Sequence, residues 1–278
     1  VLHGVGALAR LPANILPAGA ALRLTTALLE ECDIRSLVQS QRSSAMRVLH
    51  ALVQSHWEGA LANSGTALLL STVRSLDGEK DPRNLLIYFQ LLRSLVAQCE
   101  ATGAATALAA HFGGGLQEAL PEVFESLIAY FPITFTPPPN DPHQITAQHL
   151  LQALLRLFRA SAHFAPLVYD FLTSKMREDP MEEGDEEARA TRLQVLQSLA
   201  ILTPAYGATA LGPHAETIGE SFGDIVAPPP DKPGTSEAAT AMMGSAVRET
   251  MRALTAVACA AADATLLEKP VRSLPSHD

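Results

Sequence analysis

Apolar and polar positions alternate with helical spacing along most of the chain. Between Thr146 and Ala160, glutamine and arginine side chains recur at every third or fourth position, and leucine fills most of the places between them. Residues three and four apart share one face of an α-helix, so this spacing predicts a helix with one polar stripe. The apolar face is wide, which indicates contacts with more than one neighbouring helix. The stretch Pro82–Gln98 repeats the pattern.

The same spacing predicts helices along almost the whole chain and few strands. The other helical stretches are approximately Ala18–Glu31, Arg42–His56, Ser64–Leu76, Leu116–Tyr130, Ala165–Arg177, Glu186–Leu202, Pro213–Val226 and Ser236–Ala260. A short run that resembles a strand, Ile133–Thr136, stands among prolines, which interrupt sheet hydrogen bonding. The pattern therefore predicts an all-α protein.

The predicted helices fall into pairs, and the second members begin near residues 42, 82, 146, 186 and 236. Their mean spacing is about 48 residues, close to the 40–47 residues of HEAT and armadillo repeats. A single helix pair cannot bury both of its apolar sides, whereas stacked pairs can. We therefore expect a HEAT-type α-solenoid of about five stacked helix pairs.

We expect residues 1–278 to form a single array, with loops at 131–142, 177–187 and 227–236. These loops are rich in proline or in acidic residues, and none is long enough to separate two domains. The chain begins at Val1 rather than at a methionine. We therefore expect it to be a fragment of a longer protein.

Composition and charge exclude several classes of protein. The chain is 47% hydrophobic and 18% charged, which is typical of a protein with a packed core rather than a disordered one. No apolar run approaches the roughly 18–20 residues of a membrane span, so no membrane contact is expected. The net charge is −9, partly because of an acidic run at Glu178–Glu187. Nucleic acid binding needs a basic face, and no cluster of lysine and arginine supplies one, unless folding gathers scattered arginines.

The sequence offers no motif for catalysis or for a cofactor. Cys32, Cys99 and Cys259 are too far apart for a disulfide framework or a paired-cysteine metal clip, and no two histidines have zinc-ligand spacing. The GxGxxA match at Gly4–Ala9 lacks a preceding strand, and Gly113–Gly115 lacks the lysine of a phosphate-binding loop. We expect no enzyme activity, cofactor or metal, although sequence alone leaves open a catalytic triad of dispersed residues.

Two groups of aromatic residues have alternative interpretations. Trp57 either packs between repeats, which is the favoured interpretation, or anchors a partner. Phe131, Ile133 and Phe135 stand among prolines and are too apolar for an idle surface loop. They either cover the end of the core, which is again favoured, or form a patch on which a partner docks.

Two longer motifs carry a family resemblance. LDGEKDPRNLL occupies residues 76–86, and YFPITFTPPPNDP occupies residues 130–142, followed by a leucine-rich helix. In order and spacing they resemble the N-terminal region of the methyl-methanesulfonate-sensitivity (MMS-nineteen) family. The resemblance covers approximately residues 1–260, and weaker matches lie at 164–175 and 193–199. The loops at 177–187 and 227–236 are longer than the usual turns of this family, and its C-terminal region, which engages the other assembly subunits, is not in this chain.

The resemblance implies a function. The family is the HEAT-repeat adaptor of the cytosolic iron–sulfur assembly targeting complex, and it is also described as a DNA repair and transcription factor. By resemblance, this protein is a cytoplasmic and nuclear adaptor without catalytic activity. Its expected partners are a β-propeller subunit, a small subunit and client apo-proteins such as DNA polymerases, helicases and primase. A general α-solenoid scaffold for transport or trafficking is the alternative that composition does not separate from it.

The two motifs supply the candidate site residues. These are Asp77, Gly78, Glu79, Lys80, Asp81, Pro82, Arg83 and Asn84 from the first motif, and Phe131, Phe135, Pro137, Pro138, Pro139, Asn140, Asp141 and Pro142 from the second. In the first motif, Asp77 and Gly78 suit a tight turn, and Asp81 suits a helix N-cap. The favoured role of this motif is to set the angle between two helices, and the alternative is direct contact of Lys80 or Arg83 with a partner.

Overall fold

The computed structural model describes residues 6–7, 9–12, 15–58, 60–105, 115–140, 142–178, 186–226 and 237–267, and these form helices and connecting turns without a strand. Contacts between Cα atoms divide the chain into two compact units, Val1–Phe164 and Ala165–Asp278. Both units are all-α, as the hydrophobic pattern predicts. That residues 1–278 form one continuous array stays a prediction.

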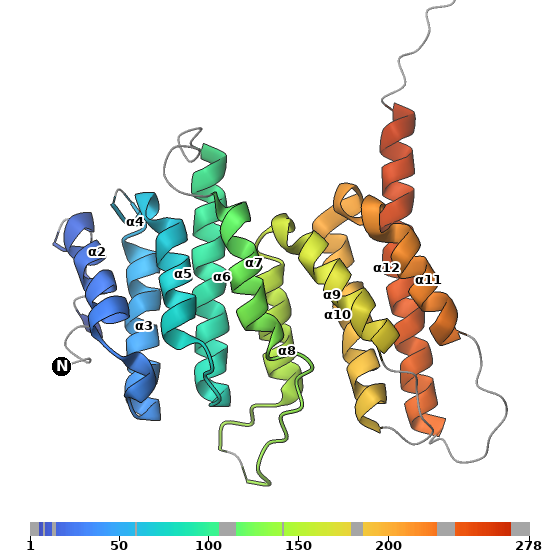
Figure 1. The fold of residues 1–278 in the computed structure, drawn as a ribbon, viewed down its shortest axis with the longest axis horizontal. Helices are drawn as coiled ribbons and strands as arrows, with labels where there is room; N and C mark the ends of the chain where they lie inside the picture. The colour runs from blue at the N-terminus through green and yellow to red at the C-terminus, as the bar shows by residue number, and fades with distance from the viewer. Residues whose placement is uncertain are drawn as a thin grey trace, which may run out of the picture. The chain divides into compact units, whose positions relative to one another are not determined.

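The first unit consists of helices that pack in two layers. Its elements are α2 (Ala18–Thr26), a π-helical turn (Ala27–Glu31), a 3₁₀ turn (Ile34–Ser36), α3 (Gln39–Ser55), α4 (Ala60–Asn63), α5 (Gly65–Leu76), α6 (Pro82–Ala105), α7 (Leu116–Ile128), α8 (Ala147–Phe158) and a 3₁₀ turn (Ala162–Phe164). Helices α3, α6 and α8 pack side by side in one layer, and α5 packs beside α7 in the other (Figure 1). The second helices of the pairs begin within a few residues of the predicted positions.

Helix α8 shows how the sequence pattern builds these layers. Its leucines are buried, whereas Arg156 and Arg159 of the polar stripe are exposed. Burial of one such leucine contributes about 1.5–3 kcal/mol. At the helix start, the Thr146 hydroxyl accepts a hydrogen bond from the His149 backbone N–H at 3.3 Å, and His149 Nδ1 accepts one from the Thr146 backbone N–H at 3.3 Å. This reciprocal pair fixes the first residue of α8.

The second unit repeats the arrangement. It contains α9 (Ala165–Glu178), α10 (Glu186–Leu211), a 3₁₀ turn (Gly212–His214), α11 (Ala215–Val226) and α12 (Glu237–Leu267). Helix α10 packs along α12, and α9 packs against α11. The Thr250 hydroxyl on α12 donates a hydrogen bond to the Leu196 carbonyl on α10 at 2.9 Å. Helices α10 and α12 begin where the sequence predicts them.

One stretch of the second unit, Glu186–Ser221, is long and apolar enough to cross a membrane by length and composition alone. Gly207, with φ 79° and ψ −179°, interrupts α10 within this stretch. Helix α10 has many buried residues and packs against α9 and α12. A buried core helix of a protein without membrane spans can have the same length and apolar composition. A single such stretch is weak evidence for a span.

The aromatic residues singled out in the sequence pack within the first unit. Trp57 Nε1 donates a hydrogen bond to Thr102 Oγ1 on α6 at 3.0 Å, and its ring lies against Gly65 at the start of α5. Phe131 and Ile133 are buried, and Phe135 is half-buried. The packing interpretation is therefore confirmed for Trp57 and for the first part of the 131–142 loop.

Several sequence features fall outside the described residues. These are Gly4, Val5 and Leu8 of the Gly4–Ala9 match, the glycines Gly113 and Gly114, most of the acidic loop at 177–187, the whole loop at 227–236, and Asp141. The strand-like run Ile133–Thr136 is among the described residues, and it forms no regular secondary structure.

Candidate partner-binding site at the α5–α6 turn

The first motif forms the turn between α5 and α6. Gly78 has φ +80°, a left-handed conformation in which side chains other than glycine are strained. The Asp81 carboxylate caps α6, because its Oδ1 accepts hydrogen bonds from the backbone N–H of Arg83 at 3.0 Å and of Asn84 at 3.4 Å. Pro82 follows as the first helical residue. The tight turn and the cap predicted from the sequence are both confirmed.

Glu79 is the buried centre of this turn, with a side chain only 3% exposed. Its carboxylate accepts five hydrogen bonds, two from Arg42 at 2.7 and 2.8 Å, one each from the backbone N–H groups of Lys80 and Asp81 at 3.0 Å, and one from Asn84 at 2.9 Å. Burial on its own raises the pKa of Glu79, but Arg42, the Asp81 N–H and Asn84 outweigh it and hold the pKa below its usual value.

The same network ties the turn to α3. Arg42 Nη1 also donates to the Leu37 carbonyl at 2.8 Å, just before α3 begins. The side chains of Gln39 and Asn84 meet at 3.0 Å, and Asn84 donates to the Gln39 carbonyl at 3.3 Å. The start of α3 and the start of α6 are therefore held in a fixed relation. Sequence reasoning missed Arg42 and Gln39, which lie well outside the motif.

The turn also contacts the segment that carries the second motif. The Ser126 hydroxyl on α7 donates to Asp77 at 2.6 Å. Arg83 pairs with Asp81 at 2.6 Å, and its Nη1 lies 3.5 Å from Nε2 of His143, just after the second motif. The first motif and the residue just after the second, 60 residues apart in the sequence, therefore lie next to each other in the fold.

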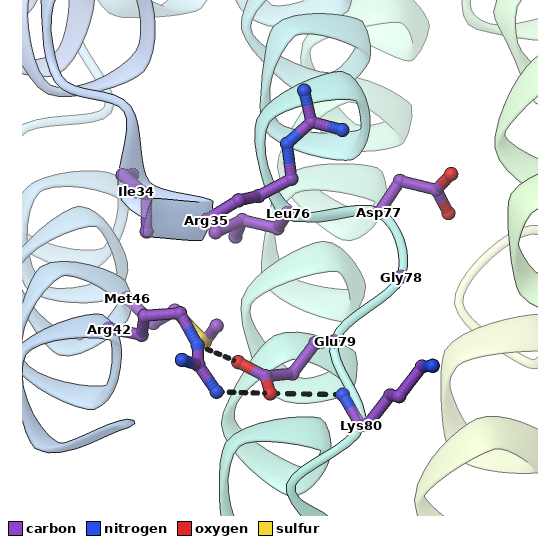
Figure 2. A pocket seen from close by; sticks show the side chains of 9 residues that line it. All are labelled: Ile34, Arg35, Arg42, Met46, Leu76, Asp77, Gly78, Glu79 and Lys80. Carbon is purple, nitrogen blue, oxygen red and sulfur yellow. Dashed lines mark hydrogen bonds and ion pairs between the residues drawn. The ribbon is translucent and has the colours of Figure 1, made fainter. Parts of the chain in front are cut away.

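A pocket of about 250 Å³ opens beside the first motif. It lies between the 3₁₀ turn Ile34–Ser36, α3 and the α5–α6 turn. Ile34, Met46 and Leu76 lie around it but are almost fully buried, so they offer little accessible surface. Figure 2 shows the Arg42–Glu79 pair on one side of the pocket and Arg35 on the other. The side chains of Arg35 and Lys80 are exposed at its rim.

The candidate residues separate into buried and accessible groups. In the first motif, Glu79 and Asn84 are buried, Asp81, Pro82 and Arg83 are half-buried, and Asp77, Gly78 and Lys80 are exposed. In the second motif, Phe131 is buried, Phe135 and Pro137 are half-buried, and Pro138, Pro139, Asn140 and Pro142 are exposed. Because Arg83 is engaged by Asp81 and His143, Lys80 is the better placed of the two cations proposed for partner contact.

Two observations bear on the chemistry available in the described part of the chain. Among the described residues, no group of three or more His, Cys, Asp and Glu side chains is placed to hold a metal ion. Cys99 is buried, and burial raises the pKa of its thiol to about 12, which leaves it protonated and a poor nucleophile. The notable features of the site are a rigid turn, a small pocket and two exposed cations.

Known proteins resemble this chain over most of its length. Residues 1–226 match the MMS19_N family, described as "Dos2-interacting transcription regulator of RNA-Pol-II". The "MMS19 nucleotide excision repair protein homolog" of Xenopus laevis is 31% identical over 207 residues, which are 74% of this chain and 18% of the relative. The Homo sapiens homologue is 30% identical, again over 74% of this chain and 18% of the relative. The Arabidopsis thaliana homologue is 27% identical over 55% of this chain and 12% of the relative. The chain thus spans less than a fifth of the curated relatives named here, and it belongs to the MMS19 N-terminal family.

Proposed function

We propose that the full-length protein is a non-catalytic adaptor that helps deliver iron–sulfur clusters to cytosolic and nuclear apo-proteins. Its clients would include enzymes of DNA replication and repair. The observation that carries the proposal is the family match over residues 1–226. The names of the relatives, which refer to nucleotide excision repair, and the family description, which refers to transcription, support a role in DNA repair and transcription.

The fold is suited to this role. Stacked helix pairs expose long helix faces and rows of turns, which are extended surfaces for large protein partners. In the first unit, the buried bonds around Glu79 tie the α5–α6 turn to the start of α3. In this proposal, the β-propeller and small subunits bind elsewhere in the full-length protein, and surfaces of this N-terminal region contact clients.

The decisive experiment is depletion of the full-length protein from cells, followed by measurement of radioactive iron incorporated into immunoprecipitated iron–sulfur proteins. We expect incorporation to fall for a cytosolic enzyme and for a nuclear helicase or polymerase. Incorporation into a mitochondrial iron–sulfur enzyme is the control and should stay unchanged. Normal incorporation into the cytosolic and nuclear proteins would refute the proposal.

Affinity purification separates this proposal from a general transport scaffold. The adaptor is expected to recover iron–sulfur apo-proteins together with a β-propeller subunit. Recovery of transport cargo without iron–sulfur proteins would instead support the scaffold for transport or trafficking.

A further inference from the structure

We propose that the exposed face of the α3–α6–α8 layer binds an acidic, extended segment of a protein partner. Folding gathers on this face three arginines that are far apart in the sequence, Arg47, Arg93 and Arg156, and we call them the arginine row. The segment would lie across the three helices and present one acidic side chain to each arginine. This inference names the chemistry of a client contact and so rests on the proposed adaptor function.

The three arginines lie on one side of the layer. Each is exposed and is two residues from a buried residue of its own helix, which is Leu49 on α3, Leu95 on α6 and Phe158 on α8. Residues two apart on an α-helix point to nearly opposite sides, so each arginine points away from the core. On α8 the core side faces the other layer, because the Phe158 ring centre lies 5.4 Å from that of Phe124 on α7.

Contacts between neighbouring helices place the arginines at one level. Side chains of α3 and α6 that bond to each other are 44 or 45 residues apart, nearly the separation of Arg47 and Arg93. Glu100 on α6 lies 3.8 Å from His163 just beyond α8, and Arg156 follows Arg93 by the same number of residues. Packed helices lie about 8–10 Å apart, so the row crosses the layer over about 16–20 Å.

The acids nearest to the three helices do not neutralise the row. Those on the helices or within three residues of their ends are Glu58, Glu79, Asp81 and Glu100. Glu79 and Asp81 each pair with an arginine outside the row. Glu58 follows the end of α3, and Glu100 lies two turns beyond Arg93, beside His163. In the described part of the chain, none of the three arginines has an ion pair.

The other described acids of the first unit belong to the side of α5 and α7. Glu118, Glu122 and Glu125 are on α7, which packs beside α5. Asp77 accepts a hydrogen bond from Ser126 of α7. The acids before α3, which are Glu30, Glu31 and Asp33, lie in or next to the short turns that pack against α5. The α3–α6–α8 face is therefore basic on a chain whose net charge is −9, and an acidic partner complements it.

The spacing of the row favours a segment in the polyproline II conformation. This conformation repeats every three residues and rises about 9 Å per repeat, which matches the distance of about 8–10 Å between neighbouring helices. An acidic residue at every third position would therefore meet each arginine in turn. Arginines so far apart do not converge on a single phosphate, as a phosphate site requires. A nucleic acid would need a longer row of cations than these three helices supply.

A second row of uncharged polar side chains suits the backbone of such a segment. One helical turn before the arginines of the row lie Ser43 on α3, Gln90 on α6 and Gln152 on α8. Glutamine amides both donate and accept hydrogen bonds, and the backbone groups of a polyproline II segment have no partners within the segment. These side chains therefore match a peptide better than they match a chain of phosphates.

The test measures binding of a fluorescein-labelled peptide, GEPPEPPEPPG, to the full-length protein by fluorescence anisotropy. We expect Arg47→Gln, Arg93→Gln and Arg156→Gln each to weaken binding about two- to fivefold, as exposed ion pairs do. The effects should multiply to roughly ten- to a hundredfold in the triple variant, because each arginine acts on a different acid. Raising NaCl from about 0.05 M to about 0.5 M should weaken binding, since salt screens these pairs.

Controls separate the position of the charges from their number. Arg74→Gln removes an exposed arginine of α5, in the other layer, and should leave binding unchanged. The peptide GPPPEEEPPPG has the same composition but clusters its acids, and GQPPQPPQPPG lacks them; both should bind more weakly than GEPPEPPEPPG. Because the three arginines are exposed, the thermal midpoint of the triple variant should match that of the natural protein.

Four results would overturn the inference. These are no measurable binding of GEPPEPPEPPG, equal binding by the triple variant and the natural protein, equal binding of the clustered peptide, and tighter binding of single-stranded or duplex DNA than of the peptide. The depletion experiment is separate. Normal iron incorporation after depletion refutes the adaptor function, whereas reduced incorporation together with unaltered peptide binding by the triple variant refutes only the arginine row.

Discussion

Among the individual side chains, Glu79 contributes most to the rigidity of the α5–α6 turn. Five hydrogen bonds converge on its carboxylate, and Arg42 supplies two of them. Removing one partner of a buried ion pair leaves the other uncompensated, but Arg42 is 22% exposed, so water relieves part of the cost. We expect Glu79→Gln to destabilise local structure by about 2 kcal/mol.

Hydrogen exchange of the full-length protein measures this effect. Amides at the start of α3 and in the α5–α6 turn should exchange about 30-fold faster in Glu79→Gln. The matched control is Glu122→Gln, which removes the partner of Arg74 in a pair whose side chains are 65% and 45% exposed. That pair lies in solvent, so its contribution to stability is small. Equal effects of the two substitutions would contradict the central role of Glu79.

The pH dependence of stability follows from the direction of the Glu79 shift. Its folded-state pKa is lowered, so its contribution is present above the unfolded pKa of about 4.3 and is lost as the pH falls through the folded pKa. We expect the difference in thermal midpoint between the natural protein and Glu79→Gln to be full near pH 6 and to shrink below about pH 4. A difference that stays constant down to pH 3 would argue against this account.

The contrast between Asp81 and Glu79 explains which side-chain roles the sequence reveals. Asp81 caps the helix that begins at the next residue, so the local sequence Asp-Pro is enough to predict its role. The partner of Glu79 is Arg42, which lies 37 residues earlier, and nothing in the local pattern distinguishes it from other arginines. The pocket between the two was equally hidden, because it forms only when α3 and the turn come together.

For the helices, the hydrophobic spacing predicts existence and pairing more reliably than it predicts ends. Helix α6 continues to Ala105 and α12 to Leu267, beyond the predicted ends at Gln98 and Ala260, because alanine-rich segments extend a helix without needing an apolar stripe. The start of α8, by contrast, is fixed by the Thr146–His149 pair and was predicted within one residue. Ends defined by a cap are therefore the predictable ones.

The start of α5 offers a test of helix packing. A Cβ atom on Gly65 would lie 2.9 Å from the Trp57 ring and 3.0 Å from Cys99 Sγ, closer than van der Waals contact allows. We expect Gly65→Ala to destabilise the first unit by about 1–2 kcal/mol despite the better helix propensity of alanine. Hydrogen exchange in α5 and α6 should show the change. Gly103→Ala, where an added Cβ has no neighbour within 4 Å, is the control and should be neutral or stabilising.

A substitution of Trp57 tests whether crowding against its ring explains a loss of stability in Gly65→Ala. If crowding against its ring causes the loss, the smaller ring in Trp57→Phe should restore part of the stability of Gly65→Ala, even though the hydrogen bond to Thr102 is lost. Effects that simply add would contradict the crowding explanation.

For the chain as a whole, the fold class can be predicted from the sequence pattern, whereas the choice of partner cannot. The all-α class and the starts of the paired helices follow from periodicity, because each helix must present its apolar face to the next. Partner choice does not follow from periodicity, since any stacked-helix protein has the same pattern. The family motifs identify the region, and the structure then divides them into the buried Glu79 and Asn84 and the exposed Lys80.

The exposed arginine row and the buried Glu79 predict different cellular defects for two classes of variant. In cells depleted of the natural protein, we expect the full-length triple variant Arg47→Gln/Arg93→Gln/Arg156→Gln to accumulate normally but to restore iron incorporation into clients only in part, because the changes lie on an exposed face. Glu79→Gln should instead lower abundance severalfold, as a loss of about 1–2 kcal/mol does.

Quantitative immunoblotting and radioactive iron incorporation, expressed per molecule of adaptor, measure the two effects. Arg74→Gln should behave as the natural protein does. Normal incorporation per molecule in the triple variant would show that the arginine row does not contribute to client maturation, and normal abundance of Glu79→Gln would show that its buried network is dispensable for folding in the cell.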